Sequence, residues 1–389
     1  MAEGGKPYKN ARVEVARAVS TLTWAGEEAK RFTGELVRLD TEEAARGRLG
    51  VVRRFPLGPV LGIAPFNFPL NLVCHKVGPA LAAGNTIVAK PASATPLTAL
   101  ALGDILVEAG VGEALSVVTC SSQDAERAVQ DDRIAKISFT GSTEVGWRLK
   151  GLAPRKRFTL ELGGNAAVIV EPDADLGHAA GRVAYGGFYQ AGQSCISVQR
   201  VLVHESVFRA FCDALVPRVE ALVVGDPADE DTDVGPLIDA GALDRVDAWV
   251  QEALAGGARA LCGAKRDDPC YLPTVLTDVR DDMKVSCMEV FGPVVTVQPY
   301  GSFDEALEMA NATEYGLQAG VFTNDVEKVF RAHREIRVGG VIHNDVSAFR
   351  ADQMPYGGVK ASGYGREGLR YAMEEMSETR ILVLSGLDL

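Results

Sequence analysis

The chain lacks the long apolar segments that mark membrane-spanning and secreted proteins. No apolar run reaches the roughly 20 residues that a membrane-spanning helix needs. The opening residues, MAEGGKPYKN, contain none of the apolar stretch of a secretory signal. We therefore expect a soluble, cytoplasmic protein with no membrane partner.

Patterns typical of metal sites, disulfide scaffolds and nucleic-acid binding are missing too. The seven cysteines form no C-x-x-C pair and are irregularly spaced, so we expect free thiols and no bound metal. Lys and Arg total 40 against 52 Asp and Glu, and the net charge of -12 argues against nucleic acid as a partner. The 389 residues exceed the roughly 250–300 that one core usually reaches, which predicts two or more domains.

What is present is an alternation of helix and strand patterns. Residues 8–35 predict a long helix and residues 36–56 an exposed hairpin. The helix would bury an apolar face that includes Val13, Val15, Val19 and Leu22. From residue 58 the alternation predicts a parallel sheet with helices on both faces. The expected strands are Val60–Ala64, Thr86–Ala89, Leu115–Val118 and Ile134–Phe139, and the helices 70–83, 95–109 and 123–130.

Residues 165–362 repeat this alternation and predict a second α/β domain. The expected strands are Ala166–Val170, Gln199–Val203, Pro293–Val297, Ala319–Phe322 and Gly340–Asn344, and the helices include 206–222 and 303–311. The tail, Thr379–Gly386, has the composition of a strand but no obvious partner in its neighbourhood. Ligands of parallel sheets bind beyond the carboxyl ends of the strands.

Three polar segments follow expected strands. Asn67 lies in the turn PFNFP, where its amide can donate to an oxyanion, although the pattern is equally typical of a plain proline-flanked turn. Lys90 ends a strand, where it can reach ribose or phosphate oxygens or remain solvated. In FTGSTEVG (139–146) a glycine turn leads into a helix whose first N–H groups can meet a pyrophosphate. The G-x-G-x-x-G spacing is absent, so an ordinary turn is the alternative.

A carboxylate and a thiol complete the set. Glu161 opens the segment ELGGN and Cys195 ends the segment GQSC. A thiolate can attack a carbonyl to form an acyl-enzyme, and a carboxylate can take a proton from the thiol or from water. Taken singly, Glu161 is as typical of a solvated surface charge, and Cys195 of a buried structural thiol.

Together and in this order, these motifs resemble the aldehyde dehydrogenase superfamily over nearly the whole chain. The matching segments are PFNFPLNL, ELGGN, GQSC, EVFGPV (289–294) and MPYGGVKASGYGREG (354–368). The resemblance implies an NAD(P)-dependent enzyme in which Cys195 forms a thiohemiacetal and then a thioester. Asn67 and the main-chain N–H of Cys195 would hold the oxyanion. Glu161 would activate the deacylating water, and Glu367 would belong to a proton relay.

The resemblance also implies a dinucleotide site in which Lys90 binds the adenosine ribose. Many NAD-preferring members carry a Glu three residues after this lysine, and Ser93 stands there instead. Loss of that carboxylate removes repulsion against a 2′-phosphate, so we expect NADP to be tolerated or preferred, unless Ser93 only fills a solvated turn. The other cofactor-binding residues that the resemblance implies are Gly141, Ser142, Gly146, Leu162, Glu289 and Phe291.

Three regions follow from the resemblance. They are a Rossmann-like cofactor domain (1–35 and 57–163), an α/β catalytic domain (164–362) and a small β oligomerisation element (36–56 and 376–389). The tail strand would extend a neighbouring subunit's sheet, which implies a homodimer or homotetramer. Family members usually carry a further N-terminal segment, and we expect an extended start to raise thermal stability.

The substrate is expected to be a small aldehyde. HNDV (343–346) through Arg350 and MPYGG resembles the branch that contains lactaldehyde and phosphonoacetaldehyde enzymes. Arg350 can face an anionic group of the substrate, because a guanidinium matches phosphonate or carboxylate geometry; a surface or interface contact is the alternative. Two other functions stay open: a cofactor-independent thiol esterase, and a non-catalytic scaffold of the same fold.

Overall fold

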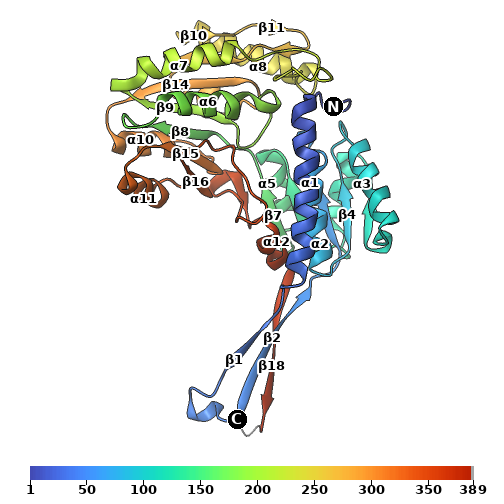
Figure 1. Ribbon diagram of the computed structural model, residues 1–389. Helices are drawn as coiled ribbons and strands as arrows, with labels where there is room; N and C mark the ends of the chain where they lie inside the picture. The colour runs from blue at the N-terminus through green and yellow to red at the C-terminus, as the bar shows by residue number, and fades with distance from the viewer. Residues whose placement is uncertain (387–389) are drawn as a thin grey trace.

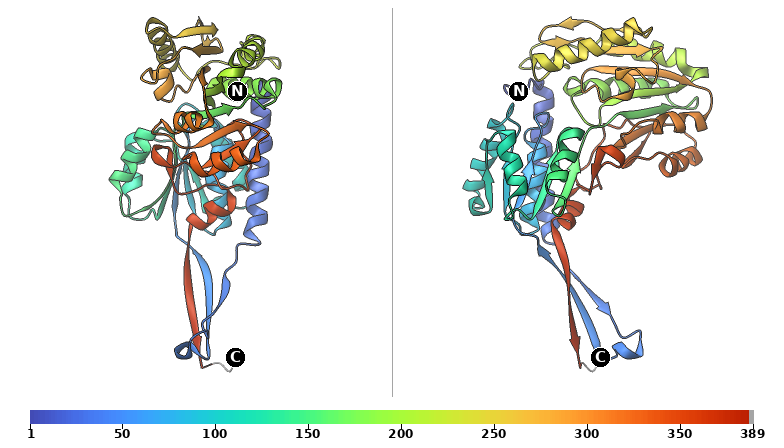
Figure 2. Two further views of the ribbon diagram at one scale, coloured as in Figure 1. Left: turned by 90° about the vertical axis from the view of Figure 1, so that its left-hand side faces the viewer. Right: turned by 180° about the vertical axis from the view of Figure 1, so that it is seen from behind.

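The computed structural model describes residues 1–386 and consists of two α/β bodies and a β stalk (Figure 1). The stalk extends away from both bodies in every view (Figure 2). The α/β class and the Rossmann-like parallel sheet expected from the sequence are confirmed. Within residues 1–386, none of the helices combines the length and the apolar character needed to cross a membrane.

The sheet of the first body has the strand order β17-β7-β6-β3-β4-β5. Its strands are β3 (Val60–Ile63), β4 (Ile87–Lys90), β5 (Leu115–Val117), β6 (Lys136–Thr140), β7 (Arg157–Glu161) and β17 (Gly363–Tyr364). All pairings are parallel except that of β17 with β7. The strand order reverses between β3 and β6, and ligands of such sheets bind at this point, outside the carboxyl ends of the strands.

Helices cover both faces of this sheet, as the alternating pattern predicts. They are α2 (Asn71–Ala82), α3 (Leu97–Glu108), α4 (Ser122–Gln130) and α5 (Thr143–Leu152). One apolar cluster packs α2 and α3 against the sheet, and a separate cluster packs α4 and α5 against it. The short helix α12 (Leu369–Glu375) returns from the far end of the chain and packs on α2.

The sheet of the second body has the order β10-β13-β14-β9-β8-β15-β16. Its strands are β8 (Ala166–Val170), β9 (Val198–His204), β10 (Arg259–Cys262), β13 (Thr274–Thr277), β14 (Val294–Tyr300), β15 (Gln318–Phe322) and β16 (Gly340–His343). Every residue of β8 is buried, because helices cover both faces, and such a strand reads as a continuous apolar run in the sequence. Its helices are α6 (Leu176–Phe188), α7 (Phe208–Glu220), α8 (Ala240–Ala255), α9 (Lys284–Cys287), α10 (Phe303–Asn311) and α11 (Val326–Glu335), and a small hairpin joins β11 (Arg266–Asp267) to β12 (Cys270–Tyr271).

The stalk joins the hairpin and the tail that the sequence analysis grouped together. Its strands are β1 (Glu35–Arg38), β2 (Arg48–Pro56) and β18 (Ser377–Ser385). β18 pairs antiparallel with β2 over its whole length, so the tail finds its partner some 330 residues earlier in the same chain. The last three residues of the expected oligomerisation element, 387–389, lie outside the described residues.

The long N-terminal helix is present, but three of the four residues of its expected apolar face lie outside. In α1 (Tyr8–Ala29) the three valines are 53–62% exposed, while Leu22 packs against the apolar core. The buried side chains are Glu14, Ala18, Thr21, Ala25 and Glu28, spaced four or three residues apart. Small and hydrogen-bonded polar side chains allow α1 to approach α2 closely, and Glu14 accepts the main-chain N–H groups of Leu70 and Asn71 at the start of α2. The positions of the valines were therefore a poor guide to the buried face.

The sequence analysis also missed β7. This strand, RFTLE, begins and ends on a charged residue and has only three uncharged positions, so its pattern is weak. It is nevertheless an interior strand between β6 and β17. Its last residue is Glu161, which is therefore a buried strand end and not a surface charge.

Candidate active site

Cys195 lies on the short segment that connects α6 with β9. Three consecutive residues before it, Gln190, Ala191 and Gly192, have φ angles of 55°, 54° and 68°. Non-glycine residues rarely adopt this left-handed region, and such strain concentrates at functional sites. At Gly192 an added Cβ would overlap the main-chain oxygen of Gly292, so close packing holds the turn in this form. The strained turn thus determines where Cys195 is placed.

The thiol of Cys195 is partly buried and contacts an aromatic hydroxyl. Its Sγ lies 3.4 Å from the phenol oxygen of Tyr356. Burial raises the pKa of Cys195 to about 12, while the hydrogen bond with Tyr356 and the charge of Arg350 act to lower it. The charges of Glu289 and Glu161 raise this pKa further, so both carboxyl groups lie close enough to affect the thiol.

Glu161 is a buried carboxyl group without a hydrogen-bond partner. The residue is 3% exposed, and neither of its carboxylate oxygens is hydrogen-bonded within residues 1–386. Burial raises its pKa well above the ordinary range, and the neighbouring charge of Glu367 raises it further. A buried polar group left unbonded is costly, so a partner such as a water molecule or a ligand is expected beside it.

Glu367 is the centre of a buried cluster of ionic groups. It accepts from the Nζ of Lys76 at 3.2 Å and from the guanidinium of Arg350 at 3.0 Å. His75 lies on the same side, with its Nδ1 3.8 Å from Glu367 and its Nε2 3.2 Å from Asp352. The cations nearby, Lys76 and Arg350 foremost, lower the pKa of Glu367 to about 2 in spite of burial, whereas burial lowers that of His75 to about 4. At neutral pH the cluster therefore holds an ionised Glu367 and a neutral His75.

Arg350 is therefore neither a surface residue nor a free cation. Its side chain is 6% exposed, pairs with Glu367 and lies over the ring of Tyr356, 3.7 Å from the ring centroid. Its Nε is buried and has no hydrogen-bond partner in the described part of the chain. The surface alternative for Arg350 is excluded, while a contact with substrate stays a prediction.

Asn67 lies in the turn between β3 and α2 and reaches the cysteine segment. Its side-chain amide donates to the main-chain oxygen of Gln193 at 2.9 Å, and its Oδ1 is buried without a partner in residues 1–386. The bond directs the amide toward the residues just before Cys195. The oxyanion role expected for Asn67 fits this placement and stays a prediction.

The residues expected to bind the dinucleotide line the carboxyl edge of the first sheet. Lys90 ends β4, and its Nζ donates to the main-chain oxygen of Pro91 at 2.9 Å. Ser93 is exposed in the turn that follows. Ser142 is the N-cap of α5 but makes no side-chain cap bond, which leaves N–H groups of the first turn available. The helix packs tightly on the sheet here, because a Cβ at Gly146 would overlap the side chain of Leu162.

Glu289 and Phe291 approach this edge from the second body. The main-chain N–H of Gly164 donates to Glu289 at 2.9 Å, and a Cβ at Gly163 would overlap the same carboxylate. Burial raises the pKa of Glu289 to about 7, and the bond from Gly164 opposes the shift. Phe291 has a φ of 47° and packs edge-on against Phe66, with 5.8 Å between ring centroids. Uncapped helix N–H groups, a strand-end lysine and this carboxylate together fit a dinucleotide.

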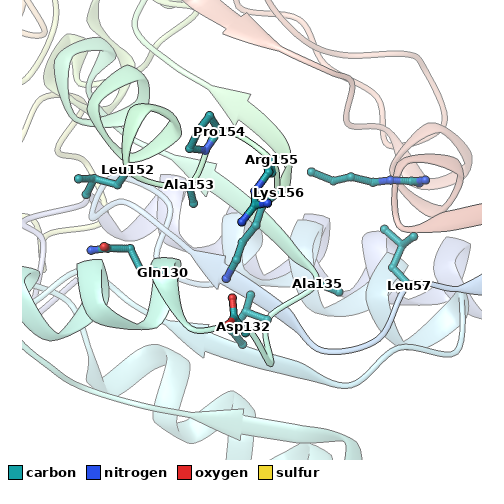
Figure 3. A pocket seen from close by; sticks show the side chains of 11 residues that line it. Leu57, Gln130, Asp132, Ala135, Leu152, Ala153, Pro154, Arg155 and Lys156 are labelled. Atoms are coloured by element: carbon teal, nitrogen blue, oxygen red, sulfur yellow. The ribbon is translucent and has the colours of Figure 1, made fainter.

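A hollow lies at the amino-terminal edge of the first sheet, opposite the edge that carries Lys90 and Glu161 (Figure 3). Ala135, Lys156 and Arg157 line it, and they stand at the starts of the parallel strands β6 and β7. Cys195 and Glu161 do not line it. Because catalytic groups of parallel sheets gather at the carboxyl ends, we do not assign this hollow to the chemistry.

Sequence reasoning missed three residues of the site: His75, Lys76 and Tyr356. Lys76 donates to Thr140 at 2.7 Å as well as to Glu367, so it joins α2 to the end of β6. The sequence did contain a sign of Lys76, because the polar pair His-Lys interrupts the largely apolar helix 70–83. Tyr356 lies within the motif MPYGG, but nothing in the sequence indicates that its hydroxyl reaches Cys195. Within residues 1–386 no group of three or more His, Cys, Asp or Glu is arranged to hold a metal ion.

The chain is similar to known enzymes in both sequence and fold. The aldehyde dehydrogenase family model matches residues 1–382. A 3-sulfolactaldehyde dehydrogenase of Priestia aryabhattai is 48% identical over 385 residues, covering 98% of this chain and 81% of the relative. Aldehyde dehydrogenase 21 of Physcomitrella patens, in complex with the reaction product succinate, superposes with a TM-score of 0.96 at 46% identity, over 98% of this chain and 80% of that one.

A further solved structure is glyceraldehyde-3-phosphate dehydrogenase GapN of Methanocaldococcus jannaschii complexed with NADP. It has a TM-score of 0.94 and 41% identity, and the match covers 98% of this chain and 83% of that chain. These findings confirm the fold and the NAD(P)-dependent enzyme class expected from the sequence. The chain belongs to the aldehyde dehydrogenase family.

Proposed function

We propose that the chain oxidises a small anionic aldehyde to its carboxylate, with Cys195 as the nucleophile and NAD(P) as the hydride acceptor. The observation that carries this proposal is the placement of Cys195 and Glu161, which are 34 positions apart in the sequence. Cys195 contacts Tyr356, whose ring lies under Arg350, and Glu161 lies close enough for its charge to act on the thiol.

The chemistry assigned to Cys195 has two stages. Its thiolate attacks the aldehyde carbon, and the amide of Asn67 and the main-chain N–H of Cys195 stabilise the oxyanion of the thiohemiacetal. A dinucleotide held by the residues at the carboxyl edge of the first sheet would supply the hydride acceptor, and Cys195 would then hold the former carbonyl carbon as a thioester. In the second stage water attacks the thioester and releases the carboxylate and the thiol.

Glu161 is proposed to take the proton from that water. Burial raises its pKa, so Glu161 holds its proton to higher pH than an exposed carboxyl group does, and it must lose that proton to act as a base. Glu367, close enough for its charge to raise the pKa of Glu161, is proposed as the relay for that proton. Glu367 has a low pKa because Lys76 and Arg350 favour its charged form. It would therefore hold the transferred proton only transiently.

An anionic substrate is supported by the charges that line the cluster. Lys76 and Arg350 provide two cations that share the single carboxylate of Glu367, and burial raises the pKa of Glu161, which disfavours a second negative charge. The free Nε of Arg350 leaves part of its guanidinium for a ligand. Relatives whose names or complexes carry a sulfonate or carboxylate, 3-sulfolactaldehyde dehydrogenase and the succinate complex, agree with this class.

NADP is proposed to serve as well as or better than NAD. Ser93 stands exposed three residues after Lys90, where a carboxylate would repel a 2′-phosphate. The similar GapN was solved with NADP. The uncharged position at 93 offers no such repulsion.

A panel of aldehydes with NAD and NADP in parallel tests the proposal, using the absorbance of the reduced nicotinamide. Succinate semialdehyde, phosphonoacetaldehyde and 3-sulfolactaldehyde are compared with neutral aldehydes of similar length, and Cys195→Ala serves as the control. Strict dependence on Cys195 and preference for the anionic aldehydes support the proposal. Oxidation by Cys195→Ala would refute the assigned nucleophile, and equal turnover of neutral aldehydes would refute the substrate class.

A further inference from the structure

Tyr356 makes three contacts, each through a different part of the residue. Its main chain pairs with Glu367 in both directions, at 3.0 and 2.7 Å. The guanidinium of Arg350 covers one face of its ring. Its phenol oxygen lies 3.4 Å from the Sγ of Cys195. The residue is 3% exposed, so the hydroxyl is held against the sulfur by the fold itself.

The direction of the hydrogen bond decides what this contact does. If the thiol donates to the phenol oxygen, the bond favours the neutral thiol; if the phenol donates, it favours the thiolate. A cation over the ring face draws electron density from the phenol and makes its O–H a better donor. The charge of Arg350 also favours a negative sulfur. Both effects select the phenol as the donor.

We propose that Tyr356 donates its phenol O–H to the Sγ of Cys195 and stabilises the thiolate, which makes Tyr356 a catalytic residue. The inference rests on the proposed function, in which Cys195 is the nucleophile. Tyr356 loses no proton in this role: the proton of the thiol passes to water, and the phenol keeps its own. When the sulfur bonds to the aldehyde carbon, the negative charge moves to the former carbonyl oxygen, and the bond from Tyr356 weakens.

A hydrogen-bond donor beside Cys195 offsets the effects that disfavour its thiolate. The sulfur is held in surroundings that disfavour its charge, and two carboxyl groups, Glu161 and Glu289, face it. Donation from Tyr356 and the charge of Arg350 oppose both effects. The ionisable side chains that face the thiol from the surrounding elements are Glu161 at the end of β7, Tyr189 after α6, Glu289 before β14, and Arg350 and Tyr356 after β16.

The test measures the thiol without any aldehyde. Iodoacetamide is added to the 389-residue chain at pH 7, and mass spectrometry follows the rate of alkylation of the peptide that contains Cys195. We expect Tyr356→Phe to slow this alkylation about 10–100-fold, because loss of a hydrogen bond to a charged group lowers the thiolate fraction by that factor. Tyr364→Phe is the matched control, because Tyr364 is 51% exposed on β17, and it should leave the rate unchanged.

A second variant makes the test independent of any packing change in Tyr356→Phe. Site-specific replacement of Tyr356 by 3-fluorotyrosine keeps the ring and the hydroxyl but makes the phenol a stronger donor, and burial keeps this phenol protonated at pH 7. We expect it to raise the alkylation rate at pH 7. An unchanged or faster alkylation in Tyr356→Phe, or a slower one with the fluorinated residue, would overturn the inference.

The inference and the proposed function fail in different ways. If Cys195→Ala still oxidises aldehydes, Cys195 is not the nucleophile, and the proposed function fails with the inference. If Cys195 is required but its alkylation rate does not depend on the phenol of Tyr356, only the role of Tyr356 is refuted.

Discussion

The side-chain amide of Asn67 donates to the main-chain oxygen of Gln193, 126 positions away in the chain. The bond ties the turn after β3 to the segment that carries Cys195 two residues later. One N–H of the amide is thereby used by the protein, and the second is left for a substrate oxygen. The amide of Asn67 therefore has two roles: it fixes the segment before Cys195, and it is proposed to donate to the oxyanion.

Replacing Asn67 by Ala is expected to lower kcat by about 10²–10³-fold, the usual effect of losing one oxyanion donor. The affinity for NADPH, measured by fluorescence titration, should change little, because within residues 1–386 the amide of Asn67 hydrogen-bonds to Gln193 and not to the residues assigned to the cofactor. Asn85→Ala is the control, since this amide is also buried but donates to Met376 beside the stalk. Normal kcat in the Asn67 variant would exclude the oxyanion role.

Glu161→Gln is expected to stabilise the fold while it stops turnover. The folded protein keeps Glu161 protonated at pH values where the unfolded chain releases the proton, so Glu161 reduces stability increasingly as pH rises above about 4.5. The variant should therefore melt at least about 2 °C higher at pH 7.5 and show no gain near pH 4. Glu113→Gln, on the surface, is the control. A lower melting temperature at pH 7.5 would show that Glu161 is held ionised.

Cys195, Glu161 and Asn67 were singled out from the sequence by the order of several short motifs, because each motif alone also fits a structural role. Most interior strands were predictable for a different reason, since burial on both faces leaves an apolar run such as AAVIV in β8. The interior strands β7 and β13, RFTLE and TVLT, mix polar with apolar residues and were not predicted. An apolar run is a local feature that can be recognised within a few residues.

The features that the sequence did not predict depend on contacts between elements that are far apart in the chain. The inner face of α1 depends on the polar contacts of Glu14 and on close packing against α2, and its three valines point outward. The short strand β7 exists because β6 and β17 flank it. Tyr356 and Lys76 reach Cys195 and Glu367 only after elements far apart in the sequence have packed. No window of the sequence contains these relationships.

Arg350→Gln is expected to separate anionic from neutral substrates. The kcat/KM for succinate semialdehyde should fall about 10–100-fold more than that for a neutral aldehyde of equal length, because one charged hydrogen bond is lost. Taking the ratio removes any common effect on Cys195. Arg182→Gln is the control, since this guanidinium pairs with Asp345 and not with the cluster. Equal losses for both substrates would rule out contact between Arg350 and the anionic group.

The stalk is expected to hold subunits together. Residues 381–384 of β18 are 38–57% exposed, and β18 lies at an edge of its sheet, so it offers an apolar surface and unpaired main-chain groups to a second copy. Light scattering should show a homodimer or homotetramer for the unaltered chain. The double substitution Leu382→Asp and Leu384→Asp should shift the mass toward the monomer, whereas Val326→Asp, on the exposed face of α11, should not. Oligomers unchanged by the β18 substitutions would place the interface elsewhere.

The most direct measurement of the central claim is the mass of the enzyme during a single turnover. Glu161→Gln is mixed with NADP and an anionic aldehyde, quenched in acid, and analysed as intact protein and as peptides. The account predicts one equivalent of NADPH and one acyl group on the Cys195 peptide, because the thioester forms but its hydrolysis lacks a base. Formation of NADPH with no acyl group on Cys195 would contradict it.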